Sequence, residues 1–158
     1  MTSPIQKVLS TLSSHHVRSL LIGGQACIFY GGAEFSRDAD IAVLTSADNL
    51  RRLEKALVDL RAESIAVPPF AAGYLLRGHA VHFRCAHPEA TGMRIDVIAV
   101  MRGVDSFEAL WERRTTVEVG PGETYEVIGL QDLVRTKKTQ RDRDWPMIRR
   151  LPGRVTLR

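Results

Sequence analysis

Three aspartates have the type and the spacing that metal-dependent phosphoryl chemistry requires, and two of them are close neighbours. Asp38 and Asp40 lie one residue apart in the segment EFSRDADIAV (34–43), directly before an apolar run. In a strand, side chains two residues apart point to one face, with their Cα atoms roughly 6.5–7 Å apart. Two divalent cations in such a site lie roughly 3.5–4 Å apart, so carboxylates at this spacing can reach both.

The third carboxylate is expected from a neighbouring strand, and Asp96 is the candidate. It is the only acidic residue in the apolar stretch RIDVIAV (94–100), and an unpaired carboxylate is costly to bury. Asp96 therefore needs a cation or a position at the end of a strand. An Asp-x-Asp pair by itself is more often a pair of caps or solvated loop residues, so the metal hypothesis depends on the residues around it.

A glycine pair precedes the aspartates. Gly23 and Gly24 follow the apolar run VRSLLI (17–22) and precede QACIFYG (25–31), which we expect to be a short helix. Backbone N–H groups at the start of a helix can face a phosphate, where the helix dipole also favours negative charge. The alternative is an ordinary tight turn from strand to helix.

The segment GLQDLVRTKKTQRDR (129–143) is predicted to be a basic helix. Leu130, Leu133, Val134, Lys137 and Arg141 fall on one stripe of it. Lys137 and Arg141 therefore continue the apolar, inward-facing stripe, where a cation requires an anion such as a triphosphate or the acidic residues themselves. In the alternative interpretation, these side chains extend to solvent.

The order of these motifs resembles the DNA polymerase beta-like nucleotidyltransferase superfamily, over about residues 20–100. Gly23-Gly24, Asp38-Ala39-Asp40 and Asp96 match its glycine pair, its Asp-x-Asp strand and its later acidic strand residue.

The C-terminal segment DLVRTKKTQRDRDW (132–145) is similar to the Asp-Leu-x-x-x-Lys helix and the Arg/Asp-rich stretch of AbiEii-type nucleotidyltransferases. The matching residues are Asp132, Leu133 and Lys137 in the first part and Arg141 and Asp144 in the second. Proteins of that type are often the toxins of bacterial toxin–antitoxin pairs, and many carry a further helical domain beyond this point.

The resemblance implies a metal-dependent transferase that moves a nucleoside monophosphate from a nucleoside triphosphate (NTP) to a hydroxyl acceptor. Asp38, Asp40 and Asp96 would be catalytic and would bind two Mg²⁺ or Mn²⁺ ions. The nucleotide would be bound by Gly23, Gly24, Arg37, Lys137 and Arg141. For Arg37 a second role is equally open, which is to neutralise the acidic cluster when no metal is bound.

The acceptor implied by the resemblance is RNA, particularly a tRNA end, a partner protein, or a small molecule such as an aminoglycoside. An antitoxin or a helical partner protein is an expected partner. Two other hypotheses stay open: a catalytically silent, antitoxin-like binding or regulatory module with the nucleotidyltransferase fold, and a basic RNA-binding α/β domain. Metal dependence distinguishes the enzyme from both.

The elements that must position these residues alternate along the chain. We expect helices at about 3–14, 25–31, 46–60, 105–114 (capped by Asp105 and Glu108) and 129–143, and a loop at VPPFAAG (67–73). We expect strands at 17–22, 40–44, 73–78 (GYLLRG), 79–85, 93–100, 115–119 and 124–128. This pattern predicts an α/β (α+β) fold, a single nucleotidyltransferase domain over 1–158 with a mixed sheet flanked by helices. Its core would span about 17–128 and its C-terminal helical segment about 129–150.

Composition agrees with a cytoplasmic protein that has polyanionic partners. The 158 residues include 22 Lys plus Arg against 18 Asp plus Glu, a net charge of +4, and much of the excess lies in the last third. The sequence has neither an apolar run of membrane-spanning length nor a signal peptide, so we expect no membrane association. Its two cysteines do not form a disulfide framework.

The run GHAVHFRCAH (78–87) invites a zinc interpretation through His79, His82, Cys85 and His87. In a strand, His82 faces away from His79 and Cys85, and those two lie roughly 20 Å apart. We therefore do not predict zinc. One of these histidines could line the pocket instead, since this segment should neighbour the Asp96 strand.

Overall fold

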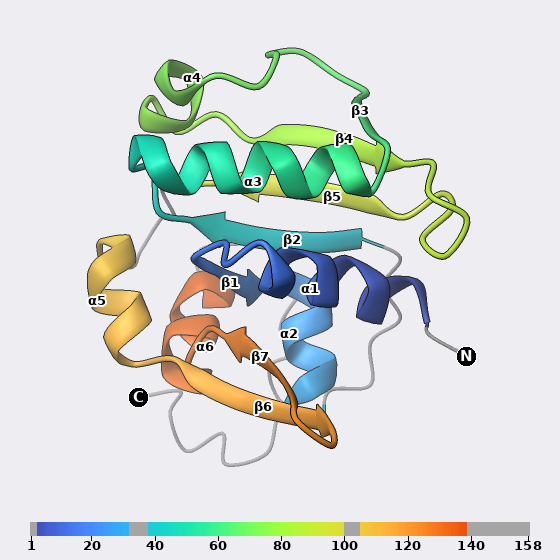
Figure 1. Cartoon of the computed structure of the whole chain (residues 1–158). Coiled ribbons are helices and arrows are strands. Elements are labelled where there is room, and N and C mark those ends of the chain that lie inside the picture. The colour runs from blue at the N-terminus through green and yellow to red at the C-terminus, as the bar shows by residue number, and fades with distance from the viewer. Residues whose placement is uncertain (1–2, 32–37, 100–104, 139–158) are drawn as a thin grey trace.

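The computed structural model describes residues 3–31, 38–99 and 105–138, and for residues 119, 120, 137 and 138 it describes the backbone only. Strands of this part of the chain form one sheet with helices on both faces (Figure 1). The strands are β1 (Ser19–Ile22), β2 (Asp38–Val43), β3 (Ala62–Ser64), β4 (Val81–Cys85), β5 (Arg94–Ile98), β6 (Thr115–Gly120) and β7 (Glu123–Val127). The helices are α1 (Pro4–Ser14), α2 (Gly23–Phe29), α3 (Ala47–Asp59), α4 (Ala72–Leu76), α5 (Phe107–Glu112) and α6 (Leu130–Lys138).

The sheet is mixed, with the strand order β3-β4-β5-β2-β1-β7-β6. The pairs β2–β5 and β1–β7 are parallel, and the other neighbouring strands are antiparallel. This architecture confirms the expected α+β class with a mixed sheet flanked by helices. In the described part of the chain, no helix is long and apolar enough to cross a membrane.

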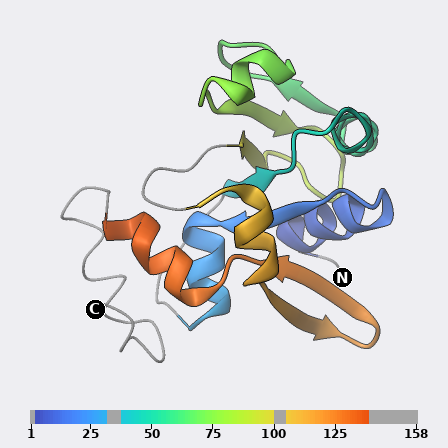
Figure 2. The same ribbon diagram turned by 90° about the vertical axis from the view of Figure 1, so that its left-hand side faces the viewer.

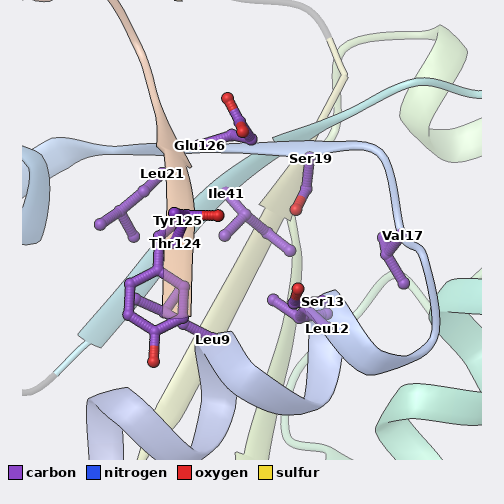
Figure 3. Close-up of a pocket in the computed structure, with 10 residues that line it drawn as sticks. All are labelled: Leu9, Leu12, Ser13, Val17, Ser19, Leu21, Ile41, Thr124, Tyr125 and Glu126. Atoms are coloured by element: carbon purple, nitrogen blue, oxygen red, sulfur yellow. The ribbon is translucent and has the colours of Figure 1, made fainter. Parts of the chain in front are cut away.

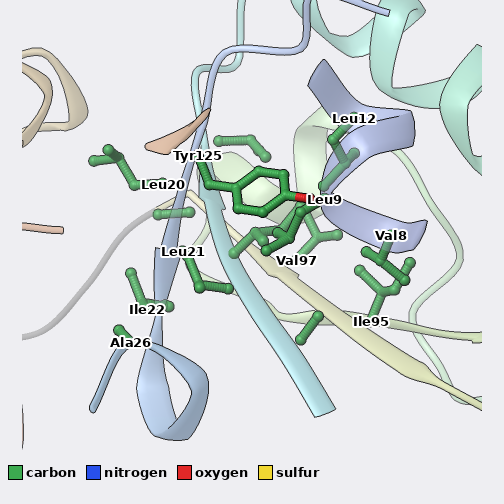
Figure 4. Close-up of a cluster of buried hydrophobic side chains, with 14 of the residues drawn as sticks. Val8, Leu9, Leu12, Leu20, Leu21, Ile22, Ala26, Ile95, Val97 and Tyr125 are labelled. Carbon is green, nitrogen blue, oxygen red and sulfur yellow. The ribbon is translucent and has the colours of Figure 1, made fainter. Parts of the chain in front are cut away.

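Two layers of helices enclose the sheet. α1 and α3 lie together on one face, while α2 and α6 lie on the other, as two perpendicular views show (Figure 1; Figure 2). Figure 4 shows the apolar cluster between α1 and the central strands, where Leu9 and Leu12 of the helix lie close to Leu21, Val97 and Tyr125. On the other side, Leu133 and Val134 of α6 are fully buried.

The helices α1 and α3 begin at serine caps, at the residues where the predicted helices 3–14 and 46–60 start. The Ser3 side chain accepts from the Gln6 amide, and the Gln6 side chain accepts from the Ser3 amide, with Pro4 in the first turn. Ser46 caps α3 in the same way through the Asn49 amide. The predicted cap of α5 is wrong by one residue, because Ser106 accepts from the Ala109 amide while Asp105 binds Arg113.

The predicted strand at 73–78 is also wrong, because this segment forms the short helix α4. Leu75 is the buried residue of this helix, and Leu76 is 62% exposed. The segment therefore packs against the core through one side of a helical turn and does not pair with the sheet. The turn ends at Gly78, whose φ is +88°. Short apolar runs fit a strand and a helical turn equally well, which explains the error. The strand β3 was not predicted.

Candidate active site

Asp40 and Asp96 meet on neighbouring strands in the middle of the sheet. β2 and β5 pair in parallel, with Asp40 opposite Asp96 and Asp38 opposite Arg94. Residues directly opposite each other on paired strands share a face, so these four side chains lie on one face of the sheet. The Asp40 and Asp96 carboxyl groups are close enough to hydrogen-bond. Asp96 therefore lies on the strand next to the one that carries Asp38 and Asp40, where it was expected.

Gly23 allows Asp40 to lie directly against the start of α2. Ile22, the last residue of β1, is opposite Asp40, so Gly23 follows immediately beside that carboxylate. A Cβ added to Gly23 would lie 2.3 Å from Oδ2 of Asp40, and the φ of Gly23 is +69°. The position therefore needs glycine for two reasons, the backbone conformation and the space that the carboxylate fills.

Two basic side chains hold Asp96 from the other side. Nδ1 of His82, which is opposite Asp96 on β4, lies 2.6 Å from Oδ1 of Asp96, and Nε of Arg94 donates to the same oxygen at 2.9 Å. Nδ1 of His82 also lies 3.1 Å from Nη2 of Arg94. A ring nitrogen cannot donate and accept at once, so the short contact with the carboxylate assigns the proton to Nδ1. Because both donors bind Oδ1, Oδ2 of Asp96 is left to other partners.

These contacts set the charge state of Asp96. Burial raises the pKa of this carboxyl group, but its hydrogen bonds with His82, Arg94 and Asp40, together with the positive charge of Arg94, lower it below the usual value of 3.8. The pKa of Arg94 is raised, first by its hydrogen bond to Asp96 and also by the nearby charges of Asp38 and Asp40. At neutral pH the Asp96 carboxyl group is therefore ionised, and it lies beside the positive charge of Arg94.

The opposite face of the sheet is apolar. Ile41, next to Asp40 in the chain, points there together with Leu21 and lines a pocket of about 100 Å³ between α1 and β7 (Figure 3). The Tyr125 hydroxyl at this pocket donates to Glu123 at 2.9 Å, and burial raises its pKa. The aspartates point away from this pocket, so it is not part of the acidic cluster.

Of the other predicted nucleotide-binding residues, Gly24 is the one that lies fully within the described part of the chain. Gly24 lies in the first turn of α2, next to Gly23. Lys137 lies on α6, where the backbone is helical as expected, but its side chain is outside the described residues. Arg37 and Arg141 also lie outside them.

Asp132, which matches the C-terminal motif of the resemblance, belongs to a different cluster. Its side chain is 2% exposed and accepts from Nε and Nη2 of Arg113 at 2.9 and 3.0 Å. Nη2 of Arg135 adds a third bond at 2.7 Å, and Arg113 also binds Asp105 at 3.0 Å. Here two arginines balance two carboxylates. The bidentate contact between the Arg113 guanidinium and the Asp132 carboxylate joins the end of α5 to the start of α6.

Sequence reasoning missed Arg94 as a partner of the acidic cluster. A usable signal was present, because Arg94 lies two residues before Asp96 and must share its face in a strand. The segment that carries His82 lies beside the Asp96 strand, as expected, and His82 contacts Asp96.

The chemistry of the donors fits a hard divalent cation. Two carboxyl groups that hydrogen-bond share a proton, and a cation can take its place. In the part of the chain that the structure describes, no group of three or more His, Cys, Asp or Glu side chains could hold a metal. Mg²⁺ does not require such a cage, since it is usually bound by one or two carboxylates, with water and substrate phosphates as its other ligands.

No family model matches this chain, and no curated protein matches its sequence significantly.

Proposed function

We propose that this chain is a metal-dependent nucleotidyltransferase, which transfers a nucleoside monophosphate from an NTP to a hydroxyl group. The observation that carries the proposal is the meeting of the Asp40 and Asp96 carboxyl groups across parallel strands, with Asp38 on the same face. Carboxylates placed together on one face are the ligands that phosphoryl-transfer enzymes use for divalent cations. The order of Gly23-Gly24, Asp-x-Asp and Asp96 along the chain supports the same function.

In this proposal Asp38, Asp40 and Asp96 hold two Mg²⁺ or Mn²⁺ ions. When bound, the ions supply Lewis-acid stabilisation of the phosphoryl oxygens and lower the pKa of the acceptor hydroxyl. The protein's own contribution is orientation. His82 and Arg94 fix Oδ1 of Asp96, and Gly23 lets Asp40 approach the end of β1 without a steric clash.

Cationic residues from the C-terminal part would balance the triphosphate. Lys137 on α6, and Arg37 and Arg141, are proposed for this role because a departing pyrophosphate accumulates negative charge. The net charge of +4 favours an acceptor that is itself a polyanion, and RNA is the acceptor we consider first. A role as the toxin of a toxin–antitoxin pair follows from the resemblance and belongs to the same proposal.

A second candidate is a binding or regulatory module that keeps the acidic cluster without catalysis. The observation that favours it is that His82 and Arg94 already bind Asp96, so the protein partly neutralises this carboxylate without a metal. Such a module would bind nucleotide or a partner protein and would not transfer a label.

The test is to incubate the full chain with each α-³²P-labelled NTP, Mg²⁺ or Mn²⁺, and total cellular RNA or protein. Label should enter one acceptor pool, should require the metal, and should be lost in Asp40→Asn. The matched control is Asp48→Asn, which makes the same charge change on exposed α3 and should keep full transfer. If no pool is labelled while calorimetry detects nucleotide binding, the binding module replaces the enzyme.

A further inference from the structure

Two arginines face each other directly beside the acidic cluster. In the antiparallel pair of β4 and β5, Arg84 is opposite Arg94. The neighbouring pair on the same face is His82 opposite Asp96. Side chains directly opposite each other on paired strands interact, and like charges in this position destabilise the sheet. A sheet that keeps such a pair needs some other group to balance it.

Within the described part of the chain, Arg94 is the member of this pair that makes an ion pair. Arg94 is bound by Asp96 at 2.9 Å and lies opposite Asp38 on its other side. Arg84 is exposed and makes no ion pair with any described side chain, although Glu63 of β3 lies opposite it. The guanidinium of Arg84 is therefore available, and it lies next to a second guanidinium that is 38% exposed.

We propose that Arg84 and Arg94 bind a phosphate group beside the acidic cluster. A guanidinium presents a planar fork of donors that matches phosphate oxygens, and a phosphate between two opposed arginines replaces their repulsion by two attractive contacts. The phosphate can come from the NTP or from the backbone of an RNA acceptor. The identity of the phosphate source depends on the proposed function. The binding of phosphate by the two arginines does not depend on it.

The position of Arg84 and Arg94 beside the acidic cluster suits the binding of a substrate that carries several phosphates. The strand order places β5 between β2, which carries Asp38 and Asp40, and β4, which carries Arg84. A phosphate bound by the arginines would thus lie next to the carboxylates but outside them, on the β4 side. A substrate with several phosphates could be held there while one of its other groups reaches the acidic cluster.

The experiment measures binding in EDTA, where neither metal binding nor catalysis takes part. The full chain and its Arg84→Gln and Arg84→Lys variants are titrated against a fluorescein-labelled single-stranded RNA without a 5′-triphosphate and, separately, against ATP. The matched control is Arg52→Gln, which removes the same charge from an exposed position on α3, a helix on the opposite face of the sheet (Figure 2).

We expect Arg84→Gln to weaken the binding of one of the two ligands about 5- to 10-fold. The affinity of Arg84→Lys should be intermediate, because a lysine keeps the positive charge but not the planar, bidentate donor geometry of a guanidinium. Weaker RNA binding, with a salt slope reduced by about 0.7, identifies an acceptor phosphate. Weaker ATP binding identifies the donor phosphate. In both cases Arg52→Gln should bind as the wild type does.

A second measurement keeps the proposal testable if the binding signals are small. Inorganic tripolyphosphate should raise the melting temperature of the wild type and of Arg52→Gln more than that of Arg84→Gln. The proposal is wrong if Arg84→Gln and Arg52→Gln behave alike in both measurements, or if the wild type shows no response to any of the three ligands up to about 1 mM. A failure of nucleotidyl transfer would leave these results unchanged, so the two proposals fail separately.

Discussion

Two clusters in this molecule join a carboxylate to arginine, and their difference separates a structural ion pair from a candidate active site. In the cluster at Asp132, the protein supplies both charges: Arg113 and Arg135 satisfy a carboxylate whose side chain is 2% exposed. In the cluster at Asp96, which is 17% exposed, Arg94 faces several aspartates and His82 is the other partner. The first cluster joins one buried carboxylate to two arginines, while the second gathers the side chains of Asp38, Asp40 and Asp96 on one face of the sheet.

The clusters also differ in what they connect. Asp132 links the start of α6 to the end of α5 through Arg113, so it holds two helices in place. Asp96 links three neighbouring strands that are already joined by backbone hydrogen bonds. Loss of the Asp96 contacts should therefore affect stability little, and any strong effect of this residue should appear in function.

The largest expected effect is on activity, in Asp40→Asn and Asp96→Asn. Each substitution should lower nucleotidyl transfer about 1,000-fold or more, because several kcal/mol of transition-state stabilisation depend on the bound metal. The melting temperature should stay within a few degrees of the wild type, or rise, because one of two neighbouring carboxylates is removed. Transfer assays and thermal unfolding of the same samples check both statements. If an inactive variant is also unfolded, the Asp40–Asp96 cluster is needed for stability, as the Asp132 cluster is, and the proposed difference between the two clusters is wrong.

The next effect is on stability, in Asp132→Asn. Replacing this buried charge should lower the free energy of unfolding by about 2–3 kcal/mol, since it removes hydrogen bonds to two charged groups. Urea denaturation measures the change, and transfer activity per folded molecule should be unchanged. The control is Asp105→Asn, an exposed partner of Arg113, which should cost about 1 kcal/mol or less. Loss of activity in a folded Asp132→Asn protein would place Asp132 in the site.

Gly23→Ala tests whether Asp40 must lie against the start of α2. The added methyl group would meet Oδ2 of Asp40, so the carboxylate must move, and we expect about a 100-fold loss of activity. Gly122→Ala is the matched control: its φ of +73° imposes a similar strain, but an added Cβ there has no neighbour within 4 Å. Both variants should lose about 1 kcal/mol of stability. Equal activities for the two would show that the contact at Gly23 does not matter.

A smaller effect is expected at His82, which is a positioning residue. Its Nδ1 holds Oδ1 of Asp96 at 2.6 Å. Asparagine can place a donor near the position of Nδ1, whereas glutamine places one near Nε2. We therefore expect His82→Asn to retain transfer activity and His82→Gln to lose about tenfold of that activity. The loss should appear in the metal concentration needed for half-maximal rate. If both variants lose activity equally, the donor position has no role.

The smallest effect is a pH dependence of stability. The pKa of Asp96 is lowered in the folded protein, so its contribution is fully present above about pH 4, the unfolded value, and is lost as the pH falls through the lower folded value. The difference in unfolding free energy between the wild type and Asp96→Asn, measured in EDTA, should therefore become less favourable to the wild type between about pH 5 and pH 2. A difference that is constant over this range would contradict the lowered pKa.

The residues that sequence reasoning predicted well are those whose placement follows from local periodicity. Asp38 and Asp40 share a face because they are two apart in a strand, and the caps at Ser3 and Ser46 follow from short-range rules. Asp96 could be linked to them because strands that follow in an α/β pattern pair in the same sheet.

The residues that it missed depend on contacts between distant segments. The bond of Arg113 to Asp132 joins positions that no helical or strand period relates. The close contact of Gly23 with Asp40 depends on the register of β1 against β2, and the opposition of Arg84 and Arg94 on the register of β4 against β5. Register is set by the packing of the whole sheet, which a single sequence does not reveal.

The parallel pairing of β2 with β5 also determines when the acidic cluster can exist during synthesis. The segments that carry Asp40 and Asp96 are separated by α3, β3, α4 and β4, so the loop between them must close before the two carboxylates meet. A ribosome-bound chain that has emerged only as far as β4 cannot contain the cluster. The two carboxylates can meet only after the segment of β5 (Arg94–Ile98) has also emerged.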